Sequence, residues 1–519
     1  MSEAFTTVDD AEFTRMVSSR AGPLLGIGAR LVAADRADVD AILALLSRPL
    51  LAMLQSQATQ LEELLDAYGA LRNERWRPFR SAVAAAKLFA GVHYSLLHLI
   101  HAVPRYRLLC EEGDLRAGLL QVRRFSAGVL YAVSRRLIET APSLGLAPRA
   151  SDAFEEILPI GRLAPDSPLR HVGDVAQTVT RLATAFLNLA AGSGPLPPAT
   201  WAPDPDRKPA ELPAENELRV LAEDFHNLQA LYDTHVAHTD VERDDPDLLS
   251  LRGHASVAYH LLGVATELVH YRERHVASAT SAGAPIQPLT HRPDWIEPEQ
   301  LDAALRDCVL ASAARYVEVG RTLAQQLLRR YAERGEITVP VPRYRGFHVR
   351  PSTLVARVAY HYGSALSMTI EGESYDAVSP LELFRANEAI NAKKRRWLAQ
   401  EIGRIVDGTE ERLGDDLVRA VRNVLTRLSD EAKVILYEQP IACIEEQPGE
   451  GQPVLSFIVD AVARLQALGK IDIVRTVTAT FRGDRRVLAD IELLAAHGYG
   501  EDAYGNNVAL PEALDYLRR

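Results

Sequence analysis

The pattern of apolar residues changes once along this chain, at Ile337, and this change constrains the fold more than any other feature. Before it, apolar residues recur at helical spacing in long segments separated by short Pro and Gly breaks, a pattern typical of helix bundles. After it, short stretches alternate apolar and polar residues as strands do, with helical stretches between them. The sequence therefore predicts a mainly α, multidomain protein with N-terminal helical bundle regions and a C-terminal α+β domain.

Changes in composition predict where the domains end. Pro and Gly gather between residues 192 and 213, where they predict a linker or a long exposed loop. We expect five parts: a helical domain (1–191), the Pro-rich linker (192–213), a second helical block (214–335), the α+β domain (336–470) with a helical insertion at about 392–431, and a C-terminal extension (471–519).

The α+β domain has a predictable order of strands and helices. Glu371 and Gly372 predict a turn between two strands, and Ser379 followed by Pro380 predicts a helix start. In order, we expect a strand at 337–342, a helix at 351–362, strands at 366–370 and 374–378, a helix from 380, a strand at 433–437 and a helix at 454–468. The extension adds a strand at 474–481 and a Gly/Asn-rich loop at 498–507.

Composition restricts the classes of function. The net charge of −11 argues against general nucleic-acid binding. The three cysteines are far apart and form no CxxC pair, which suits a reducing compartment and gives neither a disulfide framework nor a zinc site. The first residues lack the features of a signal peptide, and the most apolar stretch, 83–103, contains a lysine and three histidines. We therefore expect a cytoplasmic protein without membrane insertion, and the sequence leaves its oligomeric state open.

Residues 345–352, with the sequence Arg-Gly-Phe-His-Val-Arg-Pro-Ser, form the most informative stretch. Because Pro is favoured in the first turn of a helix, Pro351 predicts that His348 lies at or just before a helix N-terminus. Free backbone N–H groups and the positive end of the helix dipole favour an anion there. The window 337–370 contains four arginines and no Asp or Glu. The sequence therefore predicts a site for a phosphate or a carboxylate around His348.

These features together resemble the HPr family, the small phosphocarrier proteins of the bacterial phosphotransferase system. Gly346, His348, Arg350 and Pro351 fall in register with the family's signature, and the match covers 337–390 and then 432–469 after the insertion. The resemblance implies an open-faced sandwich, in which a four-stranded antiparallel sheet carries helices on one face. The helical region before residue 336 is not covered by this resemblance.

The resemblance also implies roles for individual residues. His348 would accept a phosphoryl group from an enzyme I-like donor and pass it to sugar-specific components, with Arg350 screening the phosphate charge. The other implied positions are the phosphate surroundings Arg345, Ser352 and Thr353, the regulatory serine Ser379, and the partner-facing residues Phe347, Leu381 and Phe384. Pro380 directly follows Ser379, so we expect this serine to cap a helix rather than to be phosphorylated. No cofactor is implied.

The sequence leaves three functions open. The first is a phosphocarrier or phosphorylation-dependent regulator that accepts phosphate on His348 and signals to or through the fused helical region. The second is a non-catalytic interaction or scaffold protein that uses the HPr-like domain for docking. The third is a metal-binding helical enzyme, because two Glu-x-x-His pairs resemble those of di-metal bundles, although surface or helix-packing roles also fit them. These pairs are Glu223 with His226 and Glu267 with His270.

Overall fold

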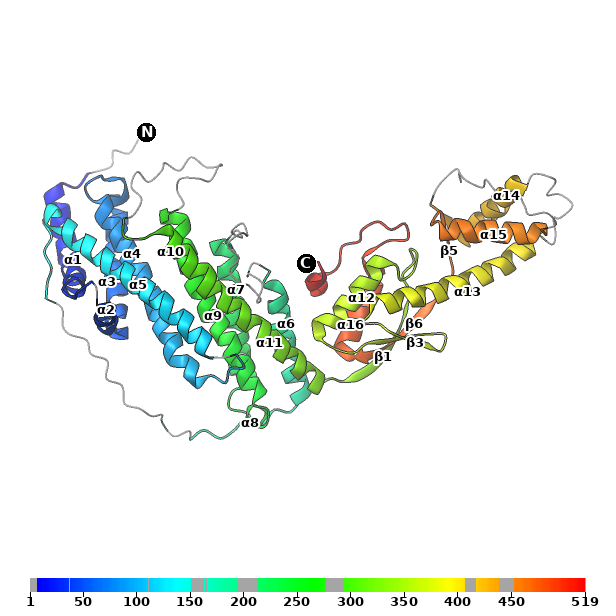
Figure 1. The fold of residues 1–519 in the computed structure, drawn as a ribbon, viewed down its shortest axis with the longest axis horizontal. Coiled ribbons are helices and arrows are strands. Elements are labelled where there is room, and N and C mark those ends of the chain that lie inside the picture. The colour runs from blue at the N-terminus through cyan, green and yellow to red at the C-terminus, as the bar shows by residue number, and fades with distance from the viewer. Residues whose placement is uncertain are drawn as a thin grey trace. The chain divides into compact units, whose positions relative to one another are not determined.

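The structure, a computed structural model, consists of two compact units, Met1–Ala324 and Gln325–Arg519, each of which is described by itself (Figure 1). The residues it describes are 7–36, 38–110, 112–150, 163, 166–194, 196, 212–276, 294–406, 417–437 and 452–518. The fold is mainly α, with 71% helix, and a four-stranded antiparallel sheet lies in the C-terminal region, within residues 334–484. The predicted fold class is therefore confirmed.

The first unit is built from helices, several of which start at residues that the sequence marks as caps. Asp9, Asp38 and Asp174 each accept a hydrogen bond from the backbone N–H three residues later, which satisfies one of the free donors of the first turn. The helices are α1 (Asp10–Val32), α2 (Val39–Leu45), α3 (Arg48–Ala67), α4 (Arg77–Ala102), α5 (Glu112–Thr140), α6 (Val175–Gly192), α7 (Glu215–His235), α8 (Asp240–Asp244), α9 (Asp247–Tyr271), α10 (Pro298–Ala303) and α11 (Ala311–Arg330), the last of which continues into the second unit.

The helices of the two predicted helical regions pack into one core. Figure 1 shows the long helices of this unit running side by side, and α4 packs on α9 as well as on α3 and α5. Phe89 of α4 meets Tyr271 of α9 edge to face, with 5.1 Å between the ring centroids. The border that we predicted between 1–191 and 214–335 is thus replaced by a single compact unit. The linker prediction falls largely on residues outside the described part of the chain.

Helix α4 is a long, apolar helix of this unit. With the turn that follows it, over Arg77–Arg105, it is long and apolar enough to cross a membrane, and α2 with α3 passes the same test only as a pair bent by 75°. In its most apolar window 67% of the residues are buried inside the unit, as in the core helix of a bundle.

The second unit contains the four-stranded sheet, in the order β1-β6-β2-β3, with every pair antiparallel. Its strands are β1 (Arg334–Pro340), β2 (Ser367–Ile370), β3 (Glu373–Asp376) and β6 (Thr478–Asp484). One face is apolar and buried, formed by Val339, Met368, Ile370, Tyr375, Ala479 and Phe481. The opposite face is polar: Thr338 lies opposite Thr480 in the register, and their hydroxyl oxygens are 2.9 Å apart. The alternation predicted from the sequence therefore separates a core face from a solvent face.

Three helices pack on the buried face of the sheet. They are α12 (Val349–Tyr362), α13 (Pro380–Val406) and α16 (Arg485–Ala496). Helix α16 contacts β1 and β6, α13 contacts β3, and α12 contacts both helices. The turn between β2 and β3 is the predicted one, since Glu371 and Gly372 have φ values of 54° and 89°, as a tight hairpin requires.

The strand that completes this sheet differs from our prediction. We expected 433–437 to be the fourth strand, but β4 (Val434–Leu436) pairs only with β5 (Ile471–Ile473) in a separate two-stranded sheet. Instead β6 lies between β1 and β2, and α16 rather than the helix at 454–468 follows it. The predicted extension at 471–519 thus supplies the last strand and helix of the domain, and the insertion reaches to β5. The sequence predicted a strand at both places, and strand pairing decides which one completes the sheet.

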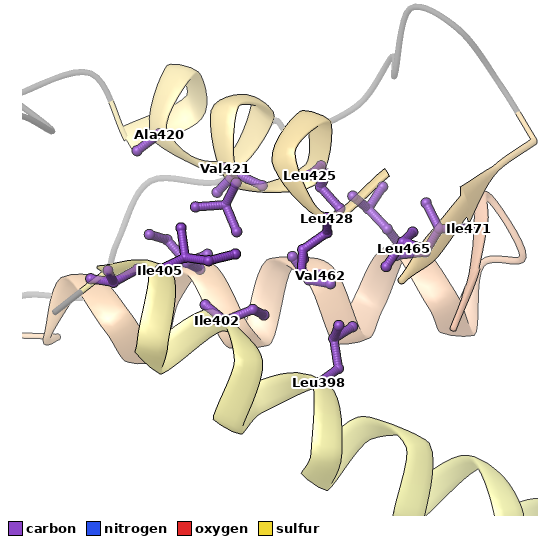
Figure 2. Close-up of a cluster of buried hydrophobic side chains, with 14 of the residues drawn as sticks. Leu398, Ile402, Ile405, Ala420, Val421, Leu425, Leu428, Val462, Leu465 and Ile471 are labelled. Carbon is purple, nitrogen blue, oxygen red and sulfur yellow. The ribbon is translucent and has the colours of Figure 1, made fainter. Parts of the chain in front are cut away.

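The insertion has an apolar core of its own. The second half of α13 packs with α14 (Leu417–Asp430), α15 (Val454–Ala467) and the β4–β5 pair. Figure 2 shows side chains from the three helices pointing toward one another, among them Ile402, Leu425 and Val462, which are at most 1% exposed. Seven further residues labelled there belong to the same cluster: Leu398, Ile405, Ala420, Val421, Leu428, Leu465 and Ile471.

Candidate functional site

His348 lies where the sequence predicted it, at the N-terminus of α12. It is the N-cap residue, with extended backbone (φ −80°, ψ −169°), and its carbonyl oxygen accepts a hydrogen bond of 3.1 Å from Ser352 N. The last turn of α12 ends at Gly363, whose φ of 59° suits glycine. The imidazole therefore lies beside the free N–H groups of the first turn, at the positive end of the helix dipole.

A tight turn before the helix holds His348 in this position. Arg345 and Gly346 both have positive φ, 52° and 62°. A Cβ on Gly346 would lie 2.1 Å from Asn387 Oδ1, so no other residue fits there without a shift of α13. The Asn387 side chain accepts from Phe347 N at 3.0 Å and donates to the carbonyl oxygen of Arg345 at 3.0 Å. Through these two hydrogen bonds of Asn387, helix α13 fixes the backbone of the turn.

Each ring nitrogen of His348 faces an oxygen acceptor. Nδ1 is 3.1 Å from the carbonyl oxygen of Gly346, and Nε2 is 3.2 Å from Oε2 of Glu501. A proton on Nδ1 would make the first contact a hydrogen bond, whereas the second is an ion-pair contact without hydrogen-bond geometry. The ring of Tyr344 meets the imidazole edge to face at 5.4 Å. A quarter of the His348 side chain remains exposed (25%).

Glu501 comes from the loop that follows α16. Its side chain is only 7% exposed, and its second carboxylate oxygen lies 3.9 Å from Nε of Arg350. The loop is closed by an antiparallel bridge between Glu501 and Asn507, and the guanidinium of Arg350 donates to Asn507 Oδ1. Oε2 of Glu501 is buried and receives no well-aligned hydrogen bond from the described residues, so its 3.2 Å contact with Nε2 of His348 is an ion-pair contact.

The surroundings of His348 are therefore not free of acids, although the window 337–370 is. Glu501 brings one carboxylate to the imidazole, and Asp472 of β5 brings another to the preceding turn, where its Oδ2 accepts from Arg345 N at 2.9 Å. Oδ1 of Asp472 pairs with Nζ of Lys394 at 3.3 Å, with both side chains buried. The chain itself thus brings a carboxylate, that of Glu501, to the imidazole beside which an anion was predicted.

The three residues predicted to surround a phosphate make other contacts. The guanidinium of Arg345 donates to the carbonyl oxygen of Gly469 at 2.8 Å, which joins the turn to the insertion. Ser352 is fully buried and its hydroxyl donates to the carbonyl oxygen of Phe347 at 2.9 Å. The exposed Thr353 donates to the carbonyl oxygen of Val349 at 2.7 Å within the helix. Arg350, in contrast, lies against the same carboxylate as the imidazole, that of Glu501.

The predicted docking residues separate into buried and exposed ones. Phe347 is fully buried, against the rings of Tyr499 and Phe481 at 5.7 and 6.4 Å, so the prediction that it faces a partner is wrong for this structure. Leu381 is 72% exposed and Phe384 is partly exposed. Ser379 directly precedes α13, and its carbonyl oxygen accepts from Leu383 N at 3.2 Å, which is the position of an N-cap residue.

The two Glu-x-x-His pairs lie in α7 and α9 of the first unit. His270 makes its ion-pair contact with Glu215, with 2.9 Å between Nδ1 and Oε2, and the ring of His226 lies 5.0 Å from that of Tyr259. Among the described residues there is no group of three or more His, Cys, Asp and Glu placed to hold a metal ion.

Reasoning from the sequence missed Glu501, Asn507 and Asp472. The glycines and asparagines of 498–507 marked a structured loop, but nothing local connected it with His348. No protein-family model, curated protein or solved structure matches this chain, so the site is defined by its geometry alone.

Proposed function

We propose that the C-terminal unit is an HPr-like phosphoacceptor domain, in which His348 receives a phosphoryl group and the fused helical unit is regulated by, or responds to, that modification. The observation that carries this proposal is the position of His348: it is the N-cap residue of α12, and its imidazole and Arg350 face the same carboxylate, in the register of the HPr signature. An imidazole at a helix N-terminus is a nucleophile placed where backbone N–H groups and an arginine stabilise added negative charge.

The order of elements supports the same proposal. The unit runs β1, α12, β2, β3, α13, the insertion, β6 and α16, which is the strand-helix-strand-strand-helix-strand-helix order of the HPr family with one insertion. The sheet is four-stranded and antiparallel with helices on one face, as the resemblance implied.

The contacts of the imidazole indicate which nitrogen reacts. If the proton is on Nε2, it lies on the side of Glu501, 3.2 Å from its Oε2, and the lone pair lies on Nδ1. In the proposed step Nδ1 leaves its contact with the Gly346 carbonyl and attacks the phosphorus of a phosphorylated donor. The N–P bond to His348 forms as the bond between phosphorus and the donor breaks, and the donor keeps that electron pair. The carboxylate of Glu501 stabilises the positive charge that develops on the ring, as the carboxylate of a His-Asp pair does.

The proposal implies a set of partners and a location. The donor is an enzyme I-like protein, and the acceptors, if the phosphate moves on, are sugar-specific components of a phosphotransferase system. These partners place the protein in the cytoplasm, without membrane insertion and without a cofactor.

One observation favours a second candidate function, a non-catalytic docking module. Glu501 already provides a negative charge beside the imidazole of His348 and Nε of Arg350, the arginine that would screen a phosphate. A domain whose anion site is filled internally could keep the fold for binding a partner and never be phosphorylated.

A phosphorylation assay of the full chain distinguishes the phosphoacceptor function from the docking function. Incubation with phosphoenolpyruvate, enzyme I and HPr should give an acid-labile label on the wild type and none on His348→Ala. His361→Ala is the matched control, because His361 lies in the same helix and should leave the label unchanged. If neither the wild type nor Glu501→Ala is labelled, the phosphoacceptor proposal fails and the docking module stands.

A further inference from the structure

A row of aromatic rings runs from the insertion to the imidazole of His348. Tyr437, the residue after β4, packs edge to face on Tyr344 with 5.3 Å between the ring centroids. Tyr344 meets the imidazole in the same way, at 5.4 Å. Both tyrosines are partly buried. Because edge-to-face pairs favour particular positions and tilts of the two rings, a residue of the insertion acts on the imidazole through one intermediate ring.

The short sheet of the insertion fixes the backbone of Tyr437. Its N–H donates to the carbonyl oxygen of Lys470 at 3.0 Å, which extends the pairing of β4 with β5 by one residue. Neighbouring residues of this sheet also bind the turn before the histidine. The carbonyl oxygen of Gly469 accepts from the guanidinium of Arg345, and Asp472 accepts from the backbone N–H of Arg345. The same sheet therefore holds both the tyrosine and the turn, so the two do not move independently.

The hydroxyl of Tyr437 reaches the loop that supplies Glu501. It donates to the carbonyl oxygen of Ala503 at 3.4 Å, two residues after Glu501. Burial raises the pKa of this hydroxyl, so it remains a donor at neutral pH. The ring of Tyr344 packs on the same loop at Gly505, where a Cβ would lie 2.7 Å from Cε1 of the tyrosine. Together the two tyrosines contact both the imidazole and the loop that carries its carboxylate partner.

We propose that Tyr437 is a positioning residue for His348, which acts through Tyr344 on the orientation of the imidazole and through Ala503 on the loop of Glu501. Its effect on rate rests on the proposed function, in which Nδ1 of His348 attacks a phosphorus atom. A nucleophile reacts only over a narrow range of positions and angles, so a small displacement of the ring slows the reaction. The insertion is then part of the acceptor site rather than an appendage of the domain.

Initial rates of acid-labile labelling of the full chain measure the effect on the reaction, with phosphorylated enzyme I as the varied donor. Tyr437→Ala removes the ring and the hydroxyl, and it should lower the maximal rate about tenfold or more. The KM for the donor should stay unchanged, because a positioning residue acts on the histidine and not on donor binding. Tyr437→Phe keeps the ring on Tyr344 and should restore the rate to within about threefold of the wild type.

The ring signal of His348 in an NMR spectrum reports the position of the imidazole whether or not the protein is phosphorylated. In the full chain, labelled with ¹³C at Cε1 of its histidines, it is the signal that His348→Ala lacks. Tyr437→Ala should shift this signal, because the neighbouring ring of Tyr344 loses its support. Tyr437→Phe should leave the signal near its wild-type position. Tyr437→Leu, which keeps apolar volume without a ring, gives the same two readings should Tyr437→Ala fail to fold.

Val462→Ala is the matched control, because Val462 lies in the core of the insertion, which contains neither tyrosine. It should lower the melting temperature and leave the labelling rate and the His348 signal unchanged. Equal slowing by Val462→Ala and Tyr437→Ala, or an unshifted His348 signal in a folded Tyr437→Ala protein, would overturn the proposal. A wild type that takes no label refutes the proposed function alone, and the His348 signal then decides whether Tyr437 positions the imidazole.

Discussion

Oε2 of Glu501 lies 3.2 Å from Nε2 of His348, and this contact joins the loop after the last long helix to the start of α12. It gives the imidazole a carboxylate partner on the side away from Nδ1. Under the proposed function this partner holds a proton on Nε2 and leaves Nδ1 to react.

The first prediction therefore concerns a variant that removes the negative charge of Glu501. Glu501→Gln keeps a side chain that can accept from Nε2 but removes the negative charge, so we expect phosphorylation of His348 to slow by about tenfold or more. The initial rate of acid-labile labelling measures this, with the exposed Glu373→Gln as a control that should not change it. Faster labelling of Glu501→Gln would mean that the carboxylate blocks the site instead of assisting it.

Lys394 and Asp472 form a buried ion pair that ties the insertion to the turn before His348. Lys394→Met leaves the Asp472 carboxylate in the core with backbone N–H partners but without its cation. We expect a loss of about 3 kcal/mol in the free energy of unfolding, measured by urea denaturation of the full chain. The double variant Lys394→Met, Asp472→Asn should regain part of that loss. Equal stability of Lys394→Met and the wild type would contradict the stabilising role assigned to this ion pair.

Tyr516 is expected to stabilise the C-terminal turn, Glu512–Leu517, through Asp490 of α16. Burial raises the pKa of the Asp490 carboxyl, and the hydroxyls of Tyr516 and Tyr362 act against that rise by donating to it. Tyr516→Phe keeps the ring that stacks on His361 and removes one of the two donors, so it should cost about 1–2 kcal/mol. Tyr504→Phe, at an exposed ring, should cost close to nothing in the same thermal unfolding experiment.

The buried imidazole of His93 should make the stability of the first unit depend on pH. The side chain is fully buried between α4 and α5, with 2.7 Å between Nδ1 and Ser126 Oγ, and burial together with the charge of Arg123 lowers its pKa from 6.5 to about 3. The unfolded chain takes up a proton below pH 6.5 and the folded chain does not. Stability is therefore full above pH 6.5 and is lost as the pH falls from there toward 3.

At about pH 4.5, two pH units below the unfolded pKa, this residue alone should reduce the free energy of unfolding by about 2.7 kcal/mol. The measurement compares urea midpoints at about pH 7 and about pH 4.5 for the wild type and His93→Gln. Burial also lowers the pKa values of His260 and His275 to about 4, so both proteins should lose stability, and the difference between them isolates His93. An identical pH dependence in the two would contradict the prediction.

Local patterns predicted much of the second unit correctly. The start of α12, at Val349 and two residues before the predicted Pro351, the turn at Glu371 and Gly372 and the start of α13 after Ser379 all depend on backbone preferences that act within a few residues. The fourth strand was assigned to the wrong stretch because 433–437 and 474–481 were both predicted as strands, and only pairing with β1 and β2 shows which one joins the sheet.

The sequence alone determined that the chain is mainly helical with a C-terminal sheet, and that His348 stands at the start of a helix beside Arg350. Periodicity and helix-start preferences are local, so they can be read from neighbouring residues. Only the tertiary structure decided that Phe347 belongs to the core, that β6 completes the sheet and that Glu501 lies against the imidazole. Burial, strand pairing and electrostatic contact depend on which distant residues the fold brings together. The stretch around His348 contains arginines and no acids, yet in the folded protein a distant carboxylate lies beside this histidine.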